Sequence, residues 1–510
     1  MSSGLVQPLI TPPHNNTREL NAGAPGMVPG GPCRELENGQ MSDYKLLIDG
    51  KLVSGAMALN VINPATEEVI AVAPRANRAQ LEQAVAAAKA AFPQWSKTPV
   101  RDRGALLARL ADAVEVRQTE FAEILTAENG KPITQAVSEM AAVVAALRYY
   151  AGVDLAPRIL KEDASQKIIE QPMPLGVVGA ISAWNVPMIL LAAKIAPALL
   201  AGNTVVAKPA ATTPLAALKL GELCADILPP GVINVIVDAN DLGDALTSHP
   251  DVAKIAFTGS TTTGRKVMES AAGTLKRLTL ELGGNDAAIV LDDVNPKEIA
   301  PELFAGATFN SGQGCVVIKR LYVHDSQYDE FCEELGRLAR EAVVDDGAKP
   351  GAQIGPLQNK AHFERVKGFL EDAKQDGVIV AGGNVLQRKG YFVEPTIVRD
   401  IGDDTRLVRE EQFGPILPVL RYAKVEDAVA RANDTEFGLG GSVWSKNLER
   451  AFAVASQINS GTVWINRHLN LQPDIPFRGD KQSGIGAELG RAGLEEYTQP
   501  RIINMAKQQA

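Results

Sequence analysis

The sequence has few cysteine, histidine and aromatic residues. Its 510 residues include four cysteines, five histidines and 5% aromatic residues. The cysteines are Cys33, Cys224, Cys315 and Cys332. They have neither the paired spacing of metal ligands nor the density of a disulfide-stabilised fold. We therefore predict no metal site and a reducing compartment, the cytoplasm.

Long runs of basic or apolar residues are also missing. Lysine and arginine number 51 against 60 acidic residues, a formal charge of -9, and no basic run follows a phosphate backbone, so we predict no nucleic-acid partner. The longest apolar stretch, residues 186 to 201, contains Lys194 and Pro197 and is shorter than the roughly 20 residues that span a bilayer. It predicts a buried helix and no membrane partner.

Length predicts a large globular protein of about three domains. Residues 1–40 are rich in Pro, Gly and Asn and lack apolar periodicity, so we predict a disordered leader or an added extension there. This stretch also lacks the hydrophobic core of a signal peptide.

Apolar periodicity beyond residue 41 predicts alternating strands and helices. Strands are expected at 176–181 and 204–207 with a helix over 188–200 between them, and a second set of alternating units starts at 287. Short β-rich runs separated by helices are typical of doubly wound α/β domains, which bind ligands beyond the carboxyl ends of their strands. We expect two such domains.

Proline and glycine give three local predictions. A helix capped by Asn77 is expected to end at Pro93, and a single helix is expected from 103 to 128. A strand over 165–171 is expected to stop before Pro172.

One thiol lies in a stretch of small and polar residues, Phe309-Asn310-Ser311-Gly312-Gln313-Gly314-Cys315. Small residues leave room for a substrate beside Cys315. A free thiol has a pKa of about 8.5, so a nucleophile needs its thiolate stabilised or a base nearby. An inert, buried cysteine is the alternative interpretation.

Several further motifs accompany this stretch in a fixed order. They are Trp184-Asn185-Val186-Pro187, Lys208-Pro209, Phe257-Thr258-Gly259-Ser260, Leu280-Glu281-Leu282-Gly283-Gly284-Asn285, Glu410-Glu411-Gln412-Phe413-Gly414-Pro415 and Pro476-Phe477-Arg478-Gly479 with Lys481-Gln482-Ser483-Gly484. From about residue 41 to the end, the chain resembles the aldehyde dehydrogenase superfamily.

The resemblance implies a fold of two doubly wound α/β domains with a small β oligomerisation element. A cofactor-binding domain would comprise 41–155 and 175–282, and a catalytic domain 283–486. The oligomerisation element would comprise 156–174 and 487–510, so a homodimer or homotetramer is expected.

The same resemblance implies NAD(P)-dependent oxidation of an aldehyde to a carboxylic acid. Cys315 would form a thiohemiacetal and then a thioester, with the Asn185 amide and the Cys315 N–H stabilising the oxyanion. Glu281 would be the base that hydrolyses the thioester. Relatives that pass the acyl group to coenzyme A typically lack this base, so hydrolysis is expected here.

For the cofactor, NAD or NADP, the resemblance implies contacts on both the adenosine and the nicotinamide side. The matching residues are Trp184, Lys208, Ala211, Gly259, Ser260, Gly264, Glu411 and Phe413. The loop 259–264 can equally be a structural strand-to-helix turn, and Phe413 a core residue. NAD-preferring relatives have an acid where this chain has Ala211, and its absence predicts a relaxed choice between NAD and NADP.

The substrate side has aliphatic residues where relatives for small aldehydes often have aromatic ones. Val186, Ile189, Leu190 and Ala193 predict a pocket for medium-sized or bulky apolar aldehydes. Alternatively, Arg467 or His468 could hold the carboxylate of a semialdehyde. The sequence assigns no role to Arg478, which stands where the motif usually has glycine.

Two other functions stay open from sequence. One is a cysteine hydrolase that needs no cofactor, although no histidine is evidently partnered with Cys315. The other is a family member without activity, which the presence of Asn185, Glu281 and Cys315 argues against.

Overall fold

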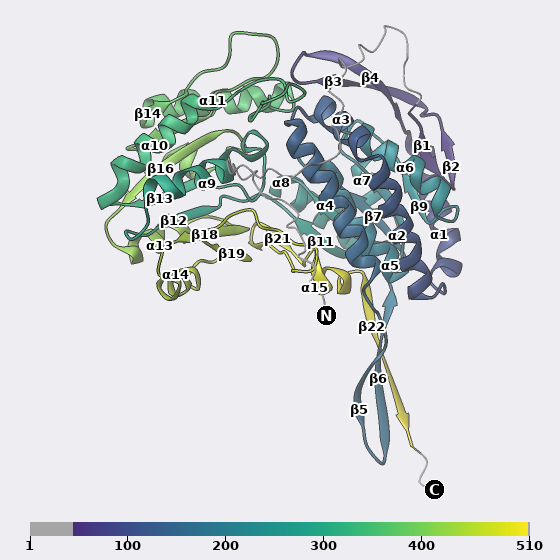
Figure 1. The fold of residues 1–510 in the computed structure, drawn as a ribbon. Helices are drawn as coiled ribbons and strands as arrows, with labels where there is room; N and C mark the ends of the chain where they lie inside the picture. Colours follow the sequence, from purple (N-terminus) through teal and green to yellow (C-terminus); the bar gives the residue numbers. More distant parts are fainter. Residues whose placement is uncertain (1–43, 508–510) are drawn as a thin grey trace, which may run out of the picture.

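A computed structural model describes residues 44–507. Two sheets with their helices form a broad body, and a narrow three-stranded arm projects from it (Figure 1). The predicted leader at 1–40 lies outside the described residues. Across 44–507, no helix combines the length and apolar character that a bilayer crossing needs.

The first sheet has eight strands, and most of the predicted cofactor and catalytic residues lie at the ends of these strands or in the loops after them. Its order is β2 (Lys51–Val53), β1 (Leu46–Ile48), β9 (Ile233–Val235), β8 (Thr204–Lys208), β7 (Val177–Ile181), β10 (Val252–Thr258), β11 (Arg277–Glu281), β21 (Gly484–Ile485). The strands from β9 to β11 are parallel. The chain builds outward from β7 through β8 to β9 and then resumes on the other side at β10. Doubly wound sheets bind ligands at such a point of reversal, which here is the carboxyl ends of β7 and β10.

Eight helices belong to this half of the chain. They are α1 (Arg78–Trp95), α2 (Val100–Val116), α3 (Gln118–Asn129), α4 (Ile133–Ala151), α5 (Pro187–Ala201), α6 (Leu215–Ile227), α7 (Gly243–Thr247) and α8 (Thr261–Ala271). Helix α5 follows β7 and packs on β7 and β8, and α2 and α4 pack over α5. Because it is covered on both sides, α5 is almost wholly buried, as its apolar sequence predicts.

The second sheet has seven strands. Its order is β14 (Val378–Ala381), β15 (Thr396–Arg399), β16 (Ile416–Tyr422), β13 (Arg320–His324), β12 (Ala287–Val290), β18 (Gly440–Trp444), β19 (Thr462–Ile465). Its helices are α9 (Pro296–Thr308), α10 (Tyr328–Glu341), α11 (Lys360–Asp376), α12 (Arg406–Arg409), α13 (Val425–Asn433) and α14 (Leu448–Ala455). Two separate apolar cores fill the two faces, one beneath α9 and α10 and one beneath α11 to α14.

Three small sheets complete the fold. Strands β3 (Met57–Asn63) and β4 (Glu68–Arg75) form a hairpin, and β17 (Phe437–Gly438) pairs with β20 (Asp480–Lys481). The arm consists of β5 (Arg158–Glu162), β6 (Gln166–Pro174) and β22 (Thr498–Ala506), with α15 (Gly490–Glu495) just before β22. The architecture agrees with the predicted α/β class, whereas the proposed domain boundaries stay a prediction.

The three local predictions from proline and glycine were wrong in detail. Helix α1 continues past Pro93 to Trp95, whose side chain is buried and stabilises the last turn. The expected long helix is two, because Arg117 leaves helical geometry (φ -103°, ψ 15°) to bond the Glu120 carboxylate. Strand β6 runs through Pro172 and Pro174, because β5 pairs only as far as Glu170 and leaves one edge free there.

Candidate active site

Three segments bring the predicted catalytic residues together. Asn185 follows β7, Glu281 is the last residue of β11, and Cys315 follows α9 and a short 3-10 turn (Phe309–Gly312). Because β7 and β11 are parallel strands on either side of β10, Asn185 and Glu281 lie at the same edge of the sheet.

The turn before Cys315 has an unusual backbone. Asn310, Ser311 and Gly312 have φ values of 49°, 59° and 73° in succession. Left-handed geometry is costly for residues other than glycine, so neighbouring segments must hold it. Asn310 N donates to Gln135 Oε1 (3.0 Å), and Asn310 Nδ2 donates to Asn185 O (2.9 Å).

The small residues of this turn make room for protein rather than for substrate. Ser311 is buried and its hydroxyl donates to Gly355 O (2.9 Å). A Cβ at Gly312 would lie 2.3 Å from Gly414 O, so only glycine fits there. The turn is therefore fixed against two other loops.

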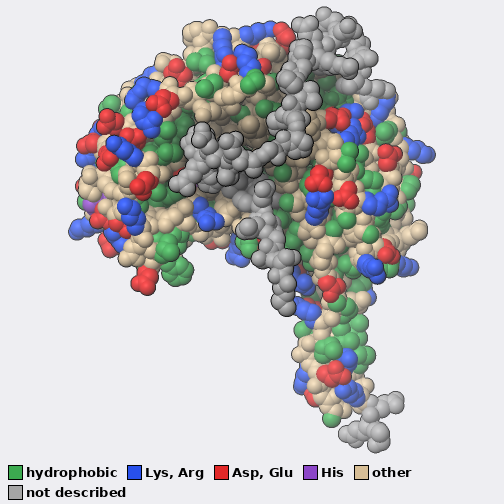
Figure 2. Space-filling model, in the orientation of Figure 1, with side chains coloured by type: hydrophobic (Ala, Val, Ile, Leu, Met, Phe, Trp, Pro, Cys, Tyr) green, Lys and Arg blue, Asp and Glu red, His purple; other side chains and the backbone are tan. Residues whose placement is uncertain are grey.

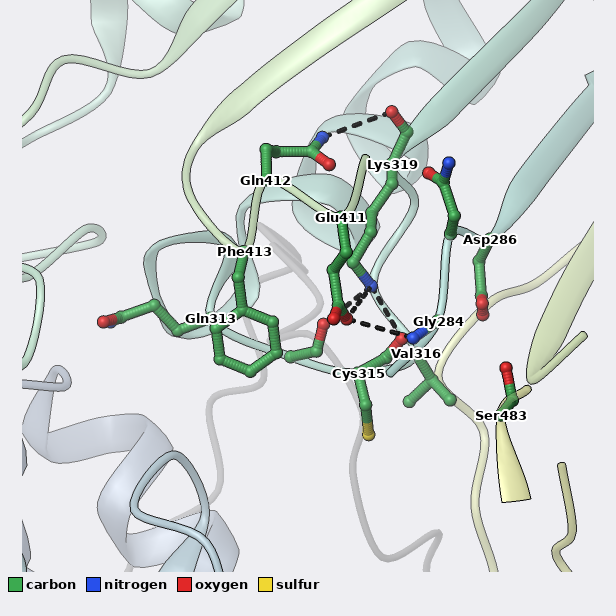
Figure 3. A network of polar contacts seen from close by, with 12 residues as sticks. Gly284, Asp286, Gln313, Cys315, Val316, Lys319, Glu411, Gln412, Phe413 and Ser483 are labelled. Carbon is green, nitrogen blue, oxygen red and sulfur yellow. Dashed lines mark hydrogen bonds and ion pairs between the residues drawn. The ribbon is translucent and has the colours of Figure 1, made fainter. Parts of the chain in front are cut away.

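A buried lysine, Lys319, binds the backbone carbonyl groups at Cys315 (Figure 3). Lys319 Nζ donates to Gly314 O (2.9 Å) and Cys315 O (2.6 Å), and it lies 3.6 Å from Glu411 Oε1. Cys315 keeps some exposed surface but is surrounded by protein, and burial raises the pKa of its thiol to about 12. The Lys319 charge lowers this pKa, while Glu411, Asp286 and Glu281 raise it.

Glu281 is a buried carboxyl group without a hydrogen-bond donor. Both of its carboxylate oxygens lack a partner. Burial first, and the neighbouring Glu488 second, raise the pKa of Glu281 well above its ordinary value, while Lys194 lowers it. A carboxyl group with two free oxygens and a raised pKa has the properties of a general base.

The surroundings of Glu281 are built from distant segments. Buried Lys194, on α5, donates to Thr258 Oγ1 (2.6 Å) and Glu488 Oε1 (2.5 Å). On the other side, β21 pairs Gly484 with Glu281. A Cβ at Gly484 would lie 2.2 Å from Leu280 O, so glycine lets β21 approach. Glu281 is thus enclosed on both sides of its strand.

Asn185 is fixed through its backbone. Its carbonyl oxygen accepts hydrogen bonds from Lys131 Nζ (2.9 Å), Asn310 Nδ2 (2.9 Å) and Asn129 Nδ2 (3.2 Å). Its side-chain Nδ2 donates to Gln313 O (3.1 Å), two residues before Cys315. The side-chain amide of Asn185 is therefore in direct contact with the loop that carries Cys315.

The predicted adenosine-side residues lie at the carboxyl ends of β8 and β10. Lys208 ends β8, and its Nζ forms a buried ion pair with Asp238 Oδ1 (2.7 Å). Ala211 lies just beyond and is buried. Gly259, Ser260 and Gly264 surround the start of α8, where Ser260 is the N-cap and accepts from Thr263 N (3.2 Å).

The other predicted cofactor residues, Trp184, Glu411 and Phe413, form a second group together with His362, which was not predicted. The rings of Trp184, His362 and Phe413 lie 5.4 to 5.8 Å apart between centroids. His362 Nε2 donates to Phe413 O (2.7 Å). Glu411 Oε1 accepts from Gly284 N (3.0 Å) (Figure 3), and burial raises the pKa of this carboxyl group.

Comparison with known proteins gives one consistent answer. Residues 53–503 match the model of the aldehyde dehydrogenase family. A mitochondrial aldehyde dehydrogenase of Leishmania tarentolae is 41% identical, over 91% of this chain and 95% of its own. The chain belongs to the aldehyde dehydrogenase family.

Other relatives bear on the substrate and the cofactor. A phenylacetaldehyde dehydrogenase of Pseudomonas fluorescens is 38% identical, over 91% of this chain and 96% of its own. An aldehyde dehydrogenase from Bacillus cereus solved in complex with NAD+ has a TM-score of 0.89 and 36% identity, covering 91% of this chain and 97% of its own. An E. coli NADP-dependent enzyme has a TM-score of 0.89 and 34% identity, covering 91% of this chain and 98% of its own.

These findings confirm the predicted family, fold class and activity. The protein is an aldehyde dehydrogenase that oxidises aldehydes with NAD or NADP. The side chains present fit such a dinucleotide. Lys208, Ser260 and the start of α8 offer donors for ribose and phosphate, and Glu411, two residues before Phe413, offers a carboxylate acceptor.

The predicted substrate residues of this aldehyde dehydrogenase divide into two groups. Val186, Ile189 and Ala193 are buried in the core, and Leu190 is half-buried, like Cys315, against that core. His468 borders a cavity of about 850 Å³, but both its ring nitrogens are engaged, by Ser442 Oγ (2.9 Å) and Val316 O (2.8 Å). His468 thus supports the backbone next to Cys315.

The same cavity contains apolar and charged groups. Its lining includes Pro301, Phe304, Phe309, Leu338, Ile354, Glu298, Glu302, Glu341 and Arg467. Three glutamates against one arginine give the cavity an acidic balance. Arg478 lies at a different hollow beside Arg277 and 3.9 Å from Asp480.

Sequence reasoning did not assign a role to several residues of the site. Lys319, Asp238, Glu488 and His362 carry no motif of their own. Lys194 did give a signal, because a lysine within an apolar helix has to find a buried partner. Its role depends on Glu488, which lies far away in the sequence.

We expect the raised pKa of Cys315 to show in its alkylation. Since the thiol of the cofactor-free protein is protonated at neutral pH, alkylation by iodoacetamide should rise about tenfold per pH unit from pH 7 to 9. Lys319→Met should slow it roughly three- to tenfold at each pH, because a charge that lowers the pKa is removed.

Two variants serve as controls for that experiment. Lys319→Arg keeps the charge and should stay close to the parent, and Cys315→Ser gives the background from other cysteines. A plateau in the rate below pH 8 would show that the pKa of Cys315 lies below 8. It would contradict the raised pKa that burial of this thiol predicts.

Proposed function

We propose that the enzyme oxidises medium-sized or bulky apolar aldehydes and hydrolyses a thioester on Cys315. The observation that carries the proposal is the buried Glu281 carboxyl group, with both oxygens free, close enough to Cys315 for its charge to raise the thiol pKa. A base in this place can activate the water that attacks a thioester on Cys315.

In the first half of the cycle, Cys315 adds to the aldehyde carbonyl. The thiol proton passes to solvent as the carbon–sulfur bond forms, so this half of the cycle does not require Glu281. Asn185 Nδ2 and the Cys315 N–H then donate to the oxygen of the thiohemiacetal. The bound cofactor supplies a hydride acceptor, so that oxidation leaves a thioester on Cys315.

In the second half, water attacks the thioester. Glu281 accepts a proton from this water, the carbon–sulfur bond breaks, and the carboxylic acid leaves. Glu488 raises the pKa of Glu281, and Lys194 lowers it. Lys319 holds the carbonyl of Gly314, which shares a peptide plane with the Cys315 N–H, so this N–H keeps its direction.

The proposed substrate class rests on the aliphatic residues after Asn185 and on a relative. Val186, Ile189 and Ala193 are aliphatic, and Leu190 is half-buried against the same core as Cys315. The cavity of about 850 Å³ is lined by none of Asn185, Glu281 and Cys315, so we do not assign it as the aldehyde pocket. Phenylacetaldehyde is the substrate that a relative's name gives. Each additional CH₂ group buried contributes about 0.8 kcal/mol, or roughly fourfold in affinity.

An aldehyde panel tests this class. We expect kcat/KM for hexanal and phenylacetaldehyde to exceed that for acetaldehyde by roughly tenfold or more, because burial of apolar surface strengthens binding. Reduced cofactor is followed at 340 nm with NAD and with NADP. A best value for acetaldehyde would contradict the proposal.

The alternative substrate is a carboxylate-bearing semialdehyde. Exposed Arg467 at the cavity favours it, but Glu298, Glu302 and Glu341 oppose a second negative charge. A hydrolase without cofactor is disfavoured as well, because no histidine within residues 44–507 contacts the Cys315 thiol. His468, which bonds Val316 O next to Cys315, has both ring nitrogens engaged.

For assembly, we propose a homodimer or homotetramer formed through the arm. The arm stands clear of the body (Figure 2), and it carries exposed apolar side chains such as Ile159, Leu160 and Ile502 among charged ones. Strand β22 is an edge strand with nine residues, and a long exposed edge of this kind pairs readily with another copy. The cytoplasm is the proposed compartment, from cysteine usage.

A further inference from the structure

A buried carboxylate lies beside the lysine that ends β8. Strands β8 and β9 are parallel neighbours, so the residues after them meet at one edge of the sheet. Lys208 is the last residue of β8, and Asp238 follows β9 by three positions. Their Nζ and Oδ1 atoms are 2.7 Å apart, and Asp238 is completely buried.

Asp238 is held in place from its other side too. Its Oδ2 accepts from Leu242 N (2.9 Å), so each carboxylate oxygen has a donor. A buried carboxylate with such partners is held in a fixed orientation as the counter-ion of Lys208. Its negative charge therefore balances the positive charge of Lys208.

This balance matters for the adenosine end of a dinucleotide. NADP differs from NAD by a 2′-phosphate with nearly two negative charges, which needs an unpaired cation nearby. Lys208 is already paired, and Ala211 offers no charge or hydrogen bond from its side chain. At the carboxyl ends of β8 and β9, the positive charge of Lys208 is therefore already neutralised and is not available to bind a 2′-phosphate.

We propose that Asp238 determines the coenzyme preference and directs it toward NAD. In this role it replaces the acid that relatives have at the position of Ala211, so the relaxed preference expected from Ala211 alone does not follow. The proposal rests on the proposed position of the adenosine ribose at Lys208.

Binding of two adenosine fragments to the whole protein tests this without the reaction. Calorimetry compares 5′-AMP with adenosine 2′,5′-bisphosphate. We expect the wild type to bind 5′-AMP roughly tenfold more tightly, and Asp238→Asn to reverse or abolish this difference, because one negative charge near the phosphate is removed. Asparagine keeps the size of the side chain and an acceptor for Leu242 N.

Kinetics with both coenzymes gives a second measurement. Asp238→Asn should raise kcat/KM for NADP by roughly tenfold and change that for NAD by less than about threefold. Asp241→Asn is the matched control: it lies on the same loop, is exposed and pairs with Arg75, so it should leave both values unchanged.

The outcomes separate this proposal from the proposed function. Equal binding of the two fragments by the wild type, which needs no variant, overturns the role of Asp238, as does an unchanged ratio in Asp238→Asn. Binding of neither fragment, with aldehyde oxidation intact, also overturns it but leaves the proposed function standing. Preferential binding of 5′-AMP without oxidation of any apolar aldehyde supports Asp238 and counts against the proposed function.

Discussion

Glu281→Gln will release one equivalent of reduced cofactor and then stall. The first half of the cycle needs the thiol and an oxyanion site, whereas only the second half depends on activating water. Glutamine has the shape of Glu281 but cannot accept a proton, so steady-state turnover should fall by about 10² to 10⁴-fold. Rapid mixing at 340 nm separates the burst from the steady state.

The pH dependence gives that experiment a second readout. Burial and Glu488 raise the pKa of Glu281, so its base form grows as pH rises through this raised pKa, and turnover should rise with it. Glu281→Gln should lose this rising limb. Removing the carboxylate also removes a charge that raises the Cys315 pKa, so the thiol does not become harder to ionise.

A control and a contrary outcome complete the test. Glu436→Gln changes an exposed glutamate paired with Arg265, and both phases should keep their parent rates. Loss of the burst in Glu281→Gln would mean that this carboxylate is required before the thioester forms, and that Glu281 is not solely a hydrolytic base.

Asn185→Ala should act on the opposite half of the cycle. It removes the side-chain donor that contacts the loop carrying Cys315, and loss of one oxyanion donor lowers kcat by about 10² to 10³-fold. The burst itself should slow, with little change in aldehyde KM, because the lost hydrogen bond forms only as negative charge develops.

The structure indicates that this variant will fold. The bonds from Lys131, Asn310 and Asn129 reach the backbone carbonyl of residue 185, which alanine keeps. Thermal unfolding checks this directly. An unchanged burst rate in a folded Asn185→Ala protein would remove Asn185 from the oxyanion site.

Local sequence patterns predicted the strands and their order along the chain well. The runs at 176–181 and 204–207 are β7 and β8, because alternation of short apolar strands with helices leaves few other arrangements. Errors arose where tertiary contacts override local preference. Trp95 extends a helix past Pro93, and the pairing with β22 carries β6 through Pro172 and Pro174.

The candidate site was predictable only in part, for the same reason. Motifs pointed to Asn185, Glu281 and Cys315, since each has a neighbourhood of its own in the sequence. The pairing of charged residues around the site cannot be read from such runs of sequence. Lys194 and Glu488 are 294 positions apart, and Lys208, at the end of β8, is 30 positions from Asp238 in the loop after β9. Such pairs become visible only when the sheets place them side by side.

The left-handed turn before Cys315 depends on contacts from distant parts of the chain, so a fragment that contains Cys315 alone would not keep the geometry of the active site. Its backbone would relax alone, and its restraints come from Gln135, Gly355 and Gly414, which belong to three separate parts of the sequence. The reactive geometry is therefore a property of the completed chain. Proteolysis or misassembly at any one of these distant segments removes the nucleophile's position even when the peptide around Cys315 is intact.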